Sequence, residues 1–167
     1  MILVKNSHKD DVYRHWQEVE KMESWPGNRV NIVTFFDSYH DLAWSISKIT
    51  VEDIDNMYII SSDDWLYDGL CTPDFKLLTA VNNFDLSPEK TPKHVDIKEK
   101  RNIFITNPSK LDRRFILVAS SPEGPYTIIE GNRRSVALAS LGQLAETDVY
   151  LGISHHINSY VWARYSN

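Results

Sequence analysis

The sequence predicts an α+β fold, in which a small mixed sheet with a hairpin is flanked by helices. Within residues 9–23, apolar side chains recur at the spacing of an amphipathic helix. Residues 115–119 and 126–129 are two apolar runs joined by a turn with two prolines and a glycine, which is typical of a hairpin. Apolar residues alternate along 149–153, as they do in a strand.

Local patterns predict the elements of residues 1–100. Ser7 can cap the helix over 9–23, and Asp10 and Asp11 lie in its first turn, where the helix dipole favours acids. The run 30–36 is rich in β-branched and aromatic residues and predicts a strand. The remaining predictions are a turn over 25–28, a helix begun by Asp37 or Ser38 and carrying Leu42, Ile46 and Ile49, a strand over 57–60, a loop over 61–64 with aromatic residues after it, and a helix over 75–81.

Prolines and lysines interrupt any periodicity between residues 82 and 102, which predicts a long loop. The last third of the chain has clearer signals. After the hairpin, a helix is expected over 133–141, with Gly142 as its C-terminal stop. A final short helix carries Ile157, Tyr160, Val161 and Arg164.

Composition indicates one globular domain over residues 1–167. The chain is 42% hydrophobic and 25% charged, which excludes a disordered protein. Cys71 is the single cysteine, which excludes an internal disulfide and a cysteine-based zinc cluster and favours a reducing cytoplasm. Neither a signal peptide nor a run of about 18 apolar residues is visible, so secretion and membrane insertion are not expected.

Charge is distributed unevenly along the chain. The formal net charge is −5, which argues against tight non-specific binding of DNA. Residues 100–134 nevertheless hold seven Lys or Arg and three Asp or Glu. This local excess suggests a small anionic ligand, and a solvated basic face is the alternative.

The segment Glu130-Gly131-Asn132-Arg133-Arg134-Ser135 is the strongest candidate for a functional site. A glycine lies at a strand-to-helix turn, and two arginines open the helix. Helix N-termini present unpaired N–H groups and bind phosphate, glycine allows close approach, and arginine matches phosphate oxygens. Alternatively, both arginines form ion pairs with Glu130, Glu123 or the acidic N-terminal half.

The stretch from Tyr126 to Ala139, Tyr-Thr-Ile-Ile-Glu-Gly-Asn-Arg-Arg-Ser-Val-Ala-Leu-Ala, resembles the signature of the ParB/sulfiredoxin superfamily. Its members have a strand, a Gly-x-x-Arg turn and an Ala-rich helix, and the resemblance covers residues 103–153. It implies that Gly131, Asn132, Arg133 and Arg134 bind a nucleoside triphosphate, ATP or CTP, with Mg²⁺. Asn132 stands where sulfiredoxins have a reactive cysteine and where partitioning proteins commonly have glutamate. Thiol chemistry is therefore not expected, and CTP hydrolysis is in doubt.

Other residues have a structural alternative beside a functional one. The carboxylates Asp63, Asp64 and Asp68 can hold Mg²⁺ or cap a helix. The adjacent His155 and His156 are expected to point apart, which makes them a poor metal pair, so no metal is predicted there. One of them could serve as a general base, and the alternative is that both are ordinary surface histidines. The aromatic residues expected either to stack on a base or to pack in the core are Trp65, Tyr67, Tyr160 and Trp162.

The leading hypothesis is a protein that binds a nucleotide or another small phosphorylated ligand. Arg133 and Arg134 would bind the phosphate, Gly131 would permit its close approach, and Asn132 would cap the helix, with Ser135 as a further cofactor-binding residue. Glu130 would be an acid–base or metal-orienting group in a phosphoryl transfer or phosphoester hydrolysis. The alternative is a non-catalytic interaction or inhibitor protein, a host- or phage-type regulator, which retains the fold and binds a protein partner.

Overall fold

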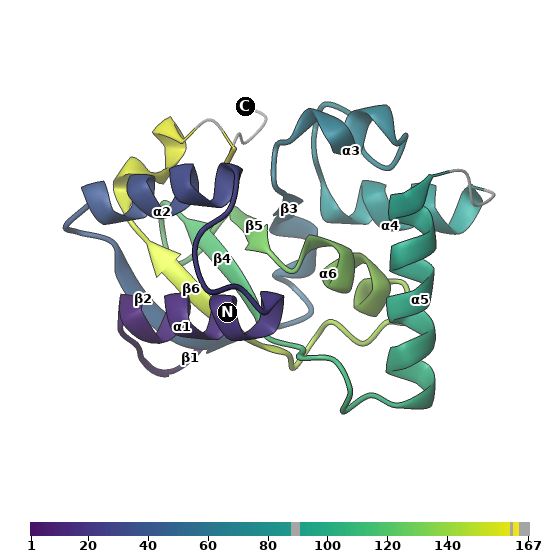
Figure 1. The fold of residues 1–167 in the computed structure, drawn as a ribbon, viewed down its shortest axis with the longest axis horizontal. Coiled ribbons are helices and arrows are strands. Elements are labelled where there is room, and N and C mark those ends of the chain that lie inside the picture. The colour runs from purple at the N-terminus through teal and green to yellow at the C-terminus, as the bar shows by residue number, and fades with distance from the viewer. Residues whose placement is uncertain (88–90, 161, 164–167) are drawn as a thin grey trace.

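A six-stranded mixed sheet separates two layers of helices in the computed structural model, which describes residues 1–87, 91–160 and 162–163 (Figure 1). The strands are β1 (Ile2–Asn6), β2 (Ala43–Lys48), β3 (Met57–Ile59), β4 (Phe115–Ala119), β5 (Tyr126–Glu130) and β6 (Asp148–Ile153). The α-helices are α1 (Lys9–Glu20), α2 (Asn28–Ser38), α3 (Asp63–Tyr67), α4 (Leu77–Leu86), α5 (Pro92–Thr106) and α6 (Asn132–Ala139), and the 3₁₀ helices are η1 (Ile54–Asn56) and η2 (His155–Ser159). The predicted α+β class is confirmed.

The sheet has the order β1-β2-β6-β4-β5-β3. The predicted hairpin is present, because β4 and β5 pair in antiparallel orientation. Strand β3 pairs with β5 in parallel orientation, so the two strands end at the same edge of the sheet. Helix α3 follows the first of these ends and α6 follows the second. Ligands of sheets with parallel strands commonly bind at such carboxyl ends.

Two cores lie on the two faces of the sheet, and β4 contributes to both. Phe115 and Leu117 pack into the core under α4 and α6, whereas Ile116 and Val118 pack against α1 and α2. Side chains alternate between the faces of a strand, so a strand covered on both faces is apolar throughout. Figure 1 shows α1 and α2 on one side of the sheet and α3 to α6 on the other.

Two predictions for residues 28–49 are wrong. The run predicted as a strand over 30–36 is helix α2, which buries Ile32, Val33 and Phe36. The segment predicted as a helix contains strand β2, in which Trp44 and Ile46 face the same core. Both segments carry apolar residues that fit either period over a short window, and packing against the sheet decides between them.

The predicted loop over 82–102 is also wrong for the residues described there. It contains the end of α4 and most of α5. Thr91 is the N-cap of α5 and accepts a hydrogen bond from His94 N at 3.4 Å, and Pro92 is the first helical residue. This Thr-Pro pair is a helix-start signal that the interrupted periodicity concealed.

Smaller differences concern the ends of elements. The N-cap of α1 is His8 rather than Ser7, and strand β1 was not predicted. Of the expected C-terminal helix, the structure has η2, whereas Val161 and Arg164 lie outside the described residues. None of the helices in the described part of the chain combines the length and the apolar character needed to cross a membrane.

Candidate functional site

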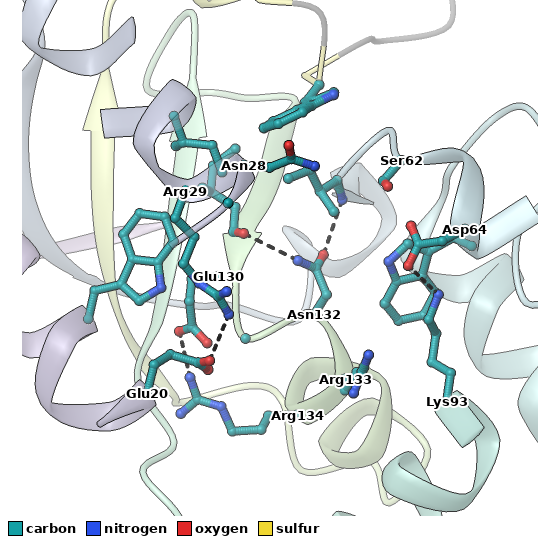
Figure 2. Close-up of a pocket in the computed structure, with 18 of the residues that line it drawn as sticks. Glu20, Asn28, Arg29, Ser62, Asp64, Lys93, Glu130, Asn132, Arg133 and Arg134 are labelled. Carbon is teal, nitrogen blue, oxygen red and sulfur yellow. Dashed lines mark hydrogen bonds and ion pairs between the residues drawn. The ribbon is translucent and has the colours of Figure 1, made fainter. Parts of the chain in front are cut away.

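A cavity of about 720 Å³ opens where β3 and β5 end (Figure 2). Its wall includes the N-terminal residues of α2 and α6, the last residue of α1, and the inner side of α5. Five basic side chains and four acidic ones line it: Arg29, Lys93, Lys100, Arg133 and Arg134, with Glu20, Asp64, Asp96 and Glu130. We call this space the α6 cavity.

The glycine of the predicted motif forms the start of α6. Gly131 is the N-cap at φ 91°, a left-handed conformation that favours glycine. A Cβ atom at this position would lie 2.4 Å from Phe115 Cδ1, so the position also lacks space for a side chain. The first backbone hydrogen bond of the helix runs from Ser135 N to Gly131 O at 2.8 Å. The N–H groups that precede it have no acceptor inside the helix and lie at its positive end.

A second helix N-terminus borders the same cavity. Helix α2 begins after Gly27, which has φ 57°, and no described side chain caps it. Its first turn carries Arg29 and no acidic residue, just as the first turn of α6 carries Arg133 and Arg134. The N-terminal end of a helix carries a partial positive charge, which disfavours arginine there. These arginines therefore add to the positive charge at the start of both helices.

The floor of the cavity is a buried ion pair between Arg134 and Glu130. Arg134 Nη2 donates to Glu130 Oε2 at 2.6 Å, and Nη1 donates to the backbone oxygen of Asp112 at 2.6 Å. The side chains of Arg134 and Glu130 are 5% and 7% exposed. The guanidinium also lies over the ring of Phe115, 5.6 Å from its centroid. Arg134 therefore forms the internal ion pair that was the alternative to phosphate binding.

Glu20 extends this pair into a group of four charges. Arg29 Nη2 donates to Glu20 Oε2 at 2.7 Å, and the Glu20 carboxyl lies beside that of Glu130 (Figure 2). Burial raises the pKa of Glu130 to about 7; Arg134 opposes this shift and the neighbouring Glu20 adds to it. A carboxyl group that titrates near neutrality in a cavity can take up or release a proton during a reaction.

Arg133 is the more accessible arginine of the motif. Its side chain is 48% exposed, and Nη1 donates to Asp96 Oδ2 at 2.8 Å. Lys100 Nζ donates to the other carboxylate oxygen of Asp96. Burial works to raise the pKa of Asp96, but the hydrogen bonds and charges of Lys100 and Arg133 outweigh it and hold this pKa below its usual range.

Lys93 occupies the place where the sequence suggested Mg²⁺. Its Nζ lies 2.7 Å from Asp64 Oδ2 and 2.8 Å from Asp68 Oδ2, and 4.6 Å from the centroid of the Trp65 ring. The side chain of Lys93 is 4% exposed. The ammonium group already forms an ion pair with each of these two carboxylates, whereas the side chain of Asp63 does not line the cavity.

The positions of Asn132 and Ser135 in the structure do not fit the roles predicted for them, those of a helix cap and of a cofactor-binding residue. Asn132 is the first residue of α6 and not its cap. Its amide accepts a hydrogen bond from Ile60 N at 3.1 Å and donates to Ile129 O at 3.4 Å, which ties the end of β5 to the segment after β3. Ser135 is fully buried and donates to Asn132 O at 2.8 Å, so its hydroxyl group supports the turn and does not line the cavity.

Two of the four candidate aromatic residues reach the cavity. Trp65 and Trp162 line it, and Ser61 N donates to Trp162 O at 2.9 Å, which ties the backbone of Trp162 to the segment after β3. Trp65 is buried under Lys93, so Trp162 is the ring available for stacking. Tyr67 is 85% exposed on α3, and Tyr160 packs in the core.

Cys71 lies in the core under α4 and outside the α6 cavity. Burial, followed by the charge of Asp74, raises the pKa of its thiol to about 12. A thiol with such a pKa holds its proton at neutral pH and is a poor nucleophile.

Sequence reasoning missed Glu20, Arg29, Lys93, Asp96 and Lys100. On α5, Lys93, Asp96 and Lys100 are spaced by three and four residues, a helical spacing that the predicted loop obscured. Glu20 and Arg29 come from helix ends far from the motif in sequence, and no spacing rule connects them to it.

Comparison with known proteins gives no match, whether to a family model, a curated protein or a solved structure. The resemblance to the ParB/sulfiredoxin superfamily therefore remains a prediction that rests on residues 126–139.

Proposed function

We propose that the α6 cavity binds a small phosphorylated molecule of the nucleotide class, ATP or CTP. The observation that carries this proposal is the convergence of two helix N-termini without side-chain caps, each with arginine in its first turn, on one cavity. A volume of about 720 Å³ lies within the range of small-molecule sites. We further propose a cytoplasmic location, which the single buried cysteine favours.

The phosphate groups would lie against the N–H groups that begin α6, with Arg133 and Lys100 as charged partners. Both side chains already share Asp96, so a bound phosphate would replace this carboxylate as the acceptor of one of them. Arg134 is a positioning residue in this arrangement, because its guanidinium is held by Glu130 and Asp112. Trp162, which lines the cavity, would stack on a base.

The reaction class that suits these groups is phosphoryl transfer or phosphoester hydrolysis. Such reactions depend mainly on positioning and on neutralisation of charge, which the helix N-termini and cations of the cavity supply. Glu130, whose pKa is about 7, would accept the proton of an attacking hydroxyl group or water. Mg²⁺ would enter with the nucleotide, because Lys93 already occupies the space between Asp64 and Asp68 and pairs with both.

A specific observation also supports the second candidate, a non-catalytic interaction or inhibitor protein. Each of the five basic side chains of the α6 cavity already forms an ion pair with an acidic residue. Such a network can be purely structural, because it connects α1, α2, α5 and α6 around the sheet. In that case the Gly-x-x-Arg turn is structural, and the function resides in a protein–protein contact.

Thermal unfolding with a panel of nucleotides, with and without Mg²⁺, distinguishes the two candidates. A ligand present at about ten times its Kd stabilises the folded state by about 1.4 kcal/mol, which raises Tm by roughly 3–6 °C for a chain of this size. A rise for one nucleotide class supports the first candidate. No rise for any nucleotide at millimolar concentration supports the second.

Two exposed arginines supply a matched pair of variants. Arg133→Ala removes a cation from the cavity, whereas Arg101→Ala removes one that pairs with Asp85 elsewhere on the surface. We expect Arg133→Ala to weaken nucleotide binding about tenfold or more, since a hydrogen bond to a charged group contributes about 1.5–3 kcal/mol. Arg101→Ala should bind as the wild type does. Equal binding by both variants would contradict the placement of the phosphate beside Arg133.

A further inference from the structure

A second cluster of potential ligands lies outside the α6 cavity, at the end of the β2–β6 pair. Ala43 and Ile153 are partners in this antiparallel pair. Asp41 precedes β2 by two residues and His155 follows β6 by two, so the same register places them opposite each other. His156 is the next residue along the 3₁₀ helix η2.

The two imidazoles do not point apart, contrary to the prediction from their adjacency. Their ring centroids lie 3.8 Å apart with an interplanar angle of 42°. His155 Nδ1 lies 2.9 Å from Asp41 Oδ2, and one ligand atom from each of the three residues lies within 4.8 Å of the other two. Neighbouring ligands bound to one metal ion at about 2.1 Å are themselves about 3.0–3.4 Å apart. His155 Nδ1 and Asp41 Oδ2 are therefore already about as close as two ligands of one ion, whereas the His156 ring needs a modest rotation to bring a nitrogen to the same ion.

Neighbouring residues hold the cluster in position. Ser154 Oγ donates to Asp41 Oδ2 at 2.9 Å, which orients the carboxylate. The ring of Tyr39, at the end of α2, stacks on His156 at 4.8 Å and 19°, and its hydroxyl group contacts Ser159 Oγ at 3.3 Å. Partners that orient the ligands are a common feature of metal sites.

We propose that Asp41, His155 and His156 form a binding site for a divalent transition-metal ion of the Zn²⁺, Co²⁺, Ni²⁺ or Cu²⁺ class. Two imidazole nitrogens and one carboxylate oxygen suit these ions, whereas Mg²⁺ and Ca²⁺ select oxygen ligands. The side chain of His155 is 73% exposed, so water or an added ligand completes the coordination. This proposal is independent of the one for the α6 cavity.

The test is a calorimetric titration of the tag-free full chain with Zn²⁺, repeated with Co²⁺ to observe its visible absorption. The expected result is one bound ion per chain. Asp41→Asn preserves the shape of the side chain and its hydrogen bond from Ser154, and His156→Ala removes an exposed ring. Each substitution should weaken binding at least about tenfold.

His8→Ala is the matched control, because His8 and Asp10 form an exposed histidine–aspartate pair that lacks a second imidazole. It should leave Zn²⁺ binding unchanged, and a millimolar excess of Mg²⁺ should not compete. The proposal is overturned if Zn²⁺ does not bind at millimolar concentration, if Asp41→Asn and His156→Ala bind as the wild type does, or if Mg²⁺ displaces the ion. In those cases Asp41 and His155 form only an ion pair.

Discussion

Arg134→Ala tests the assignment of Arg134 to the interior of the protein. The substitution removes hydrogen bonds to Glu130 and to the backbone oxygen of Asp112, both at 2.6 Å, and leaves a carboxyl group that is 7% exposed without its cation. Each hydrogen bond to a charged group contributes about 1.5–3 kcal/mol, and breaking a buried ion pair costs about 3–5 kcal/mol. We therefore expect the free energy of unfolding to fall by about 3–5 kcal/mol at pH 7. Tm should fall by roughly 6–20 °C.

The assay is urea and thermal unfolding of the ligand-free protein, with Arg133→Ala as the control. Arg133 is half exposed and shares Asp96 with Lys100, so its removal should change the free energy of unfolding by about 0.5 kcal/mol or less. The loss caused by Arg134→Ala should be larger at pH 8 than at pH 5. At pH 5, Glu130 is protonated in both proteins, whereas at pH 8 only the wild type has a cation beside the ionised carboxylate.

A ligand-free Arg134→Ala variant as stable as Arg133→Ala would contradict this assignment. It would show that the contacts of Arg134 with Glu130 and Asp112 do not stabilise the folded protein. A second variant keeps the test informative if Arg134→Ala does not fold. Replacing both partners, as in Glu130→Gln with Arg134→Met, should recover part of the stability, because no buried charge is then left unpaired.

Three further predictions follow from the structure. Because the pKa of Glu130 is raised from 4.5 to about 7 on folding, this group gives stability that is complete below about pH 4.5 and is lost as the pH rises through 7. The difference in unfolding free energy between pH 5 and pH 8 should therefore fall by about 2.5 kcal/mol in Glu130→Gln, and an unchanged difference would contradict the burial of the carboxyl group. Gly131→Ala should lower the free energy of unfolding in urea by roughly 2–4 kcal/mol, because the new Cβ would lie 2.4 Å from Phe115 Cδ1 and φ is 91°. An unchanged free energy would mean that the turn differs from the one described. With a net charge of −5 and its cavity cations paired, the protein should not bind duplex DNA below micromolar concentration at physiological salt, and a tight, steeply salt-dependent complex in a fluorescence anisotropy titration would contradict this.

The last third of the fold could be predicted from the sequence because its signals are local. Apolar runs alternate there with turn-forming residues every few positions, which marks the limits of β4, β5 and α6 and the turn at Gly131. Residues 28–49 lack turn-forming residues at such regular intervals. Their period is ambiguous, and only packing of Ile32 and Phe36 against the sheet makes one segment a helix and the next a strand.

The motif lies at the edge of the α6 cavity, but it did not indicate which of its side chains are buried. Glu130, Gly131 and Arg133 border the α6 cavity, and burial decides that Arg134 faces Glu130. Burial depends on elements distant in sequence, such as the loop that carries Asp112. The spacing of two consecutive arginines contains no information about which of them is covered.

Binding of an anion at the start of α6 would change the chemical shifts of the backbone amides there. The ¹⁵N-labelled protein would be titrated with ATP, CTP and inorganic tripolyphosphate, with and without Mg²⁺. We expect the largest shifts on the amides of Asn132, Arg133 and Arg134, which have no acceptor inside the helix, and on those at the start of α2. Arg133→Ala should reduce these shifts at equal ligand concentration, and Arg101→Ala should not. Shifts that are absent at millimolar ligand, or that map to a surface away from the α6 cavity, would contradict anion binding at this site.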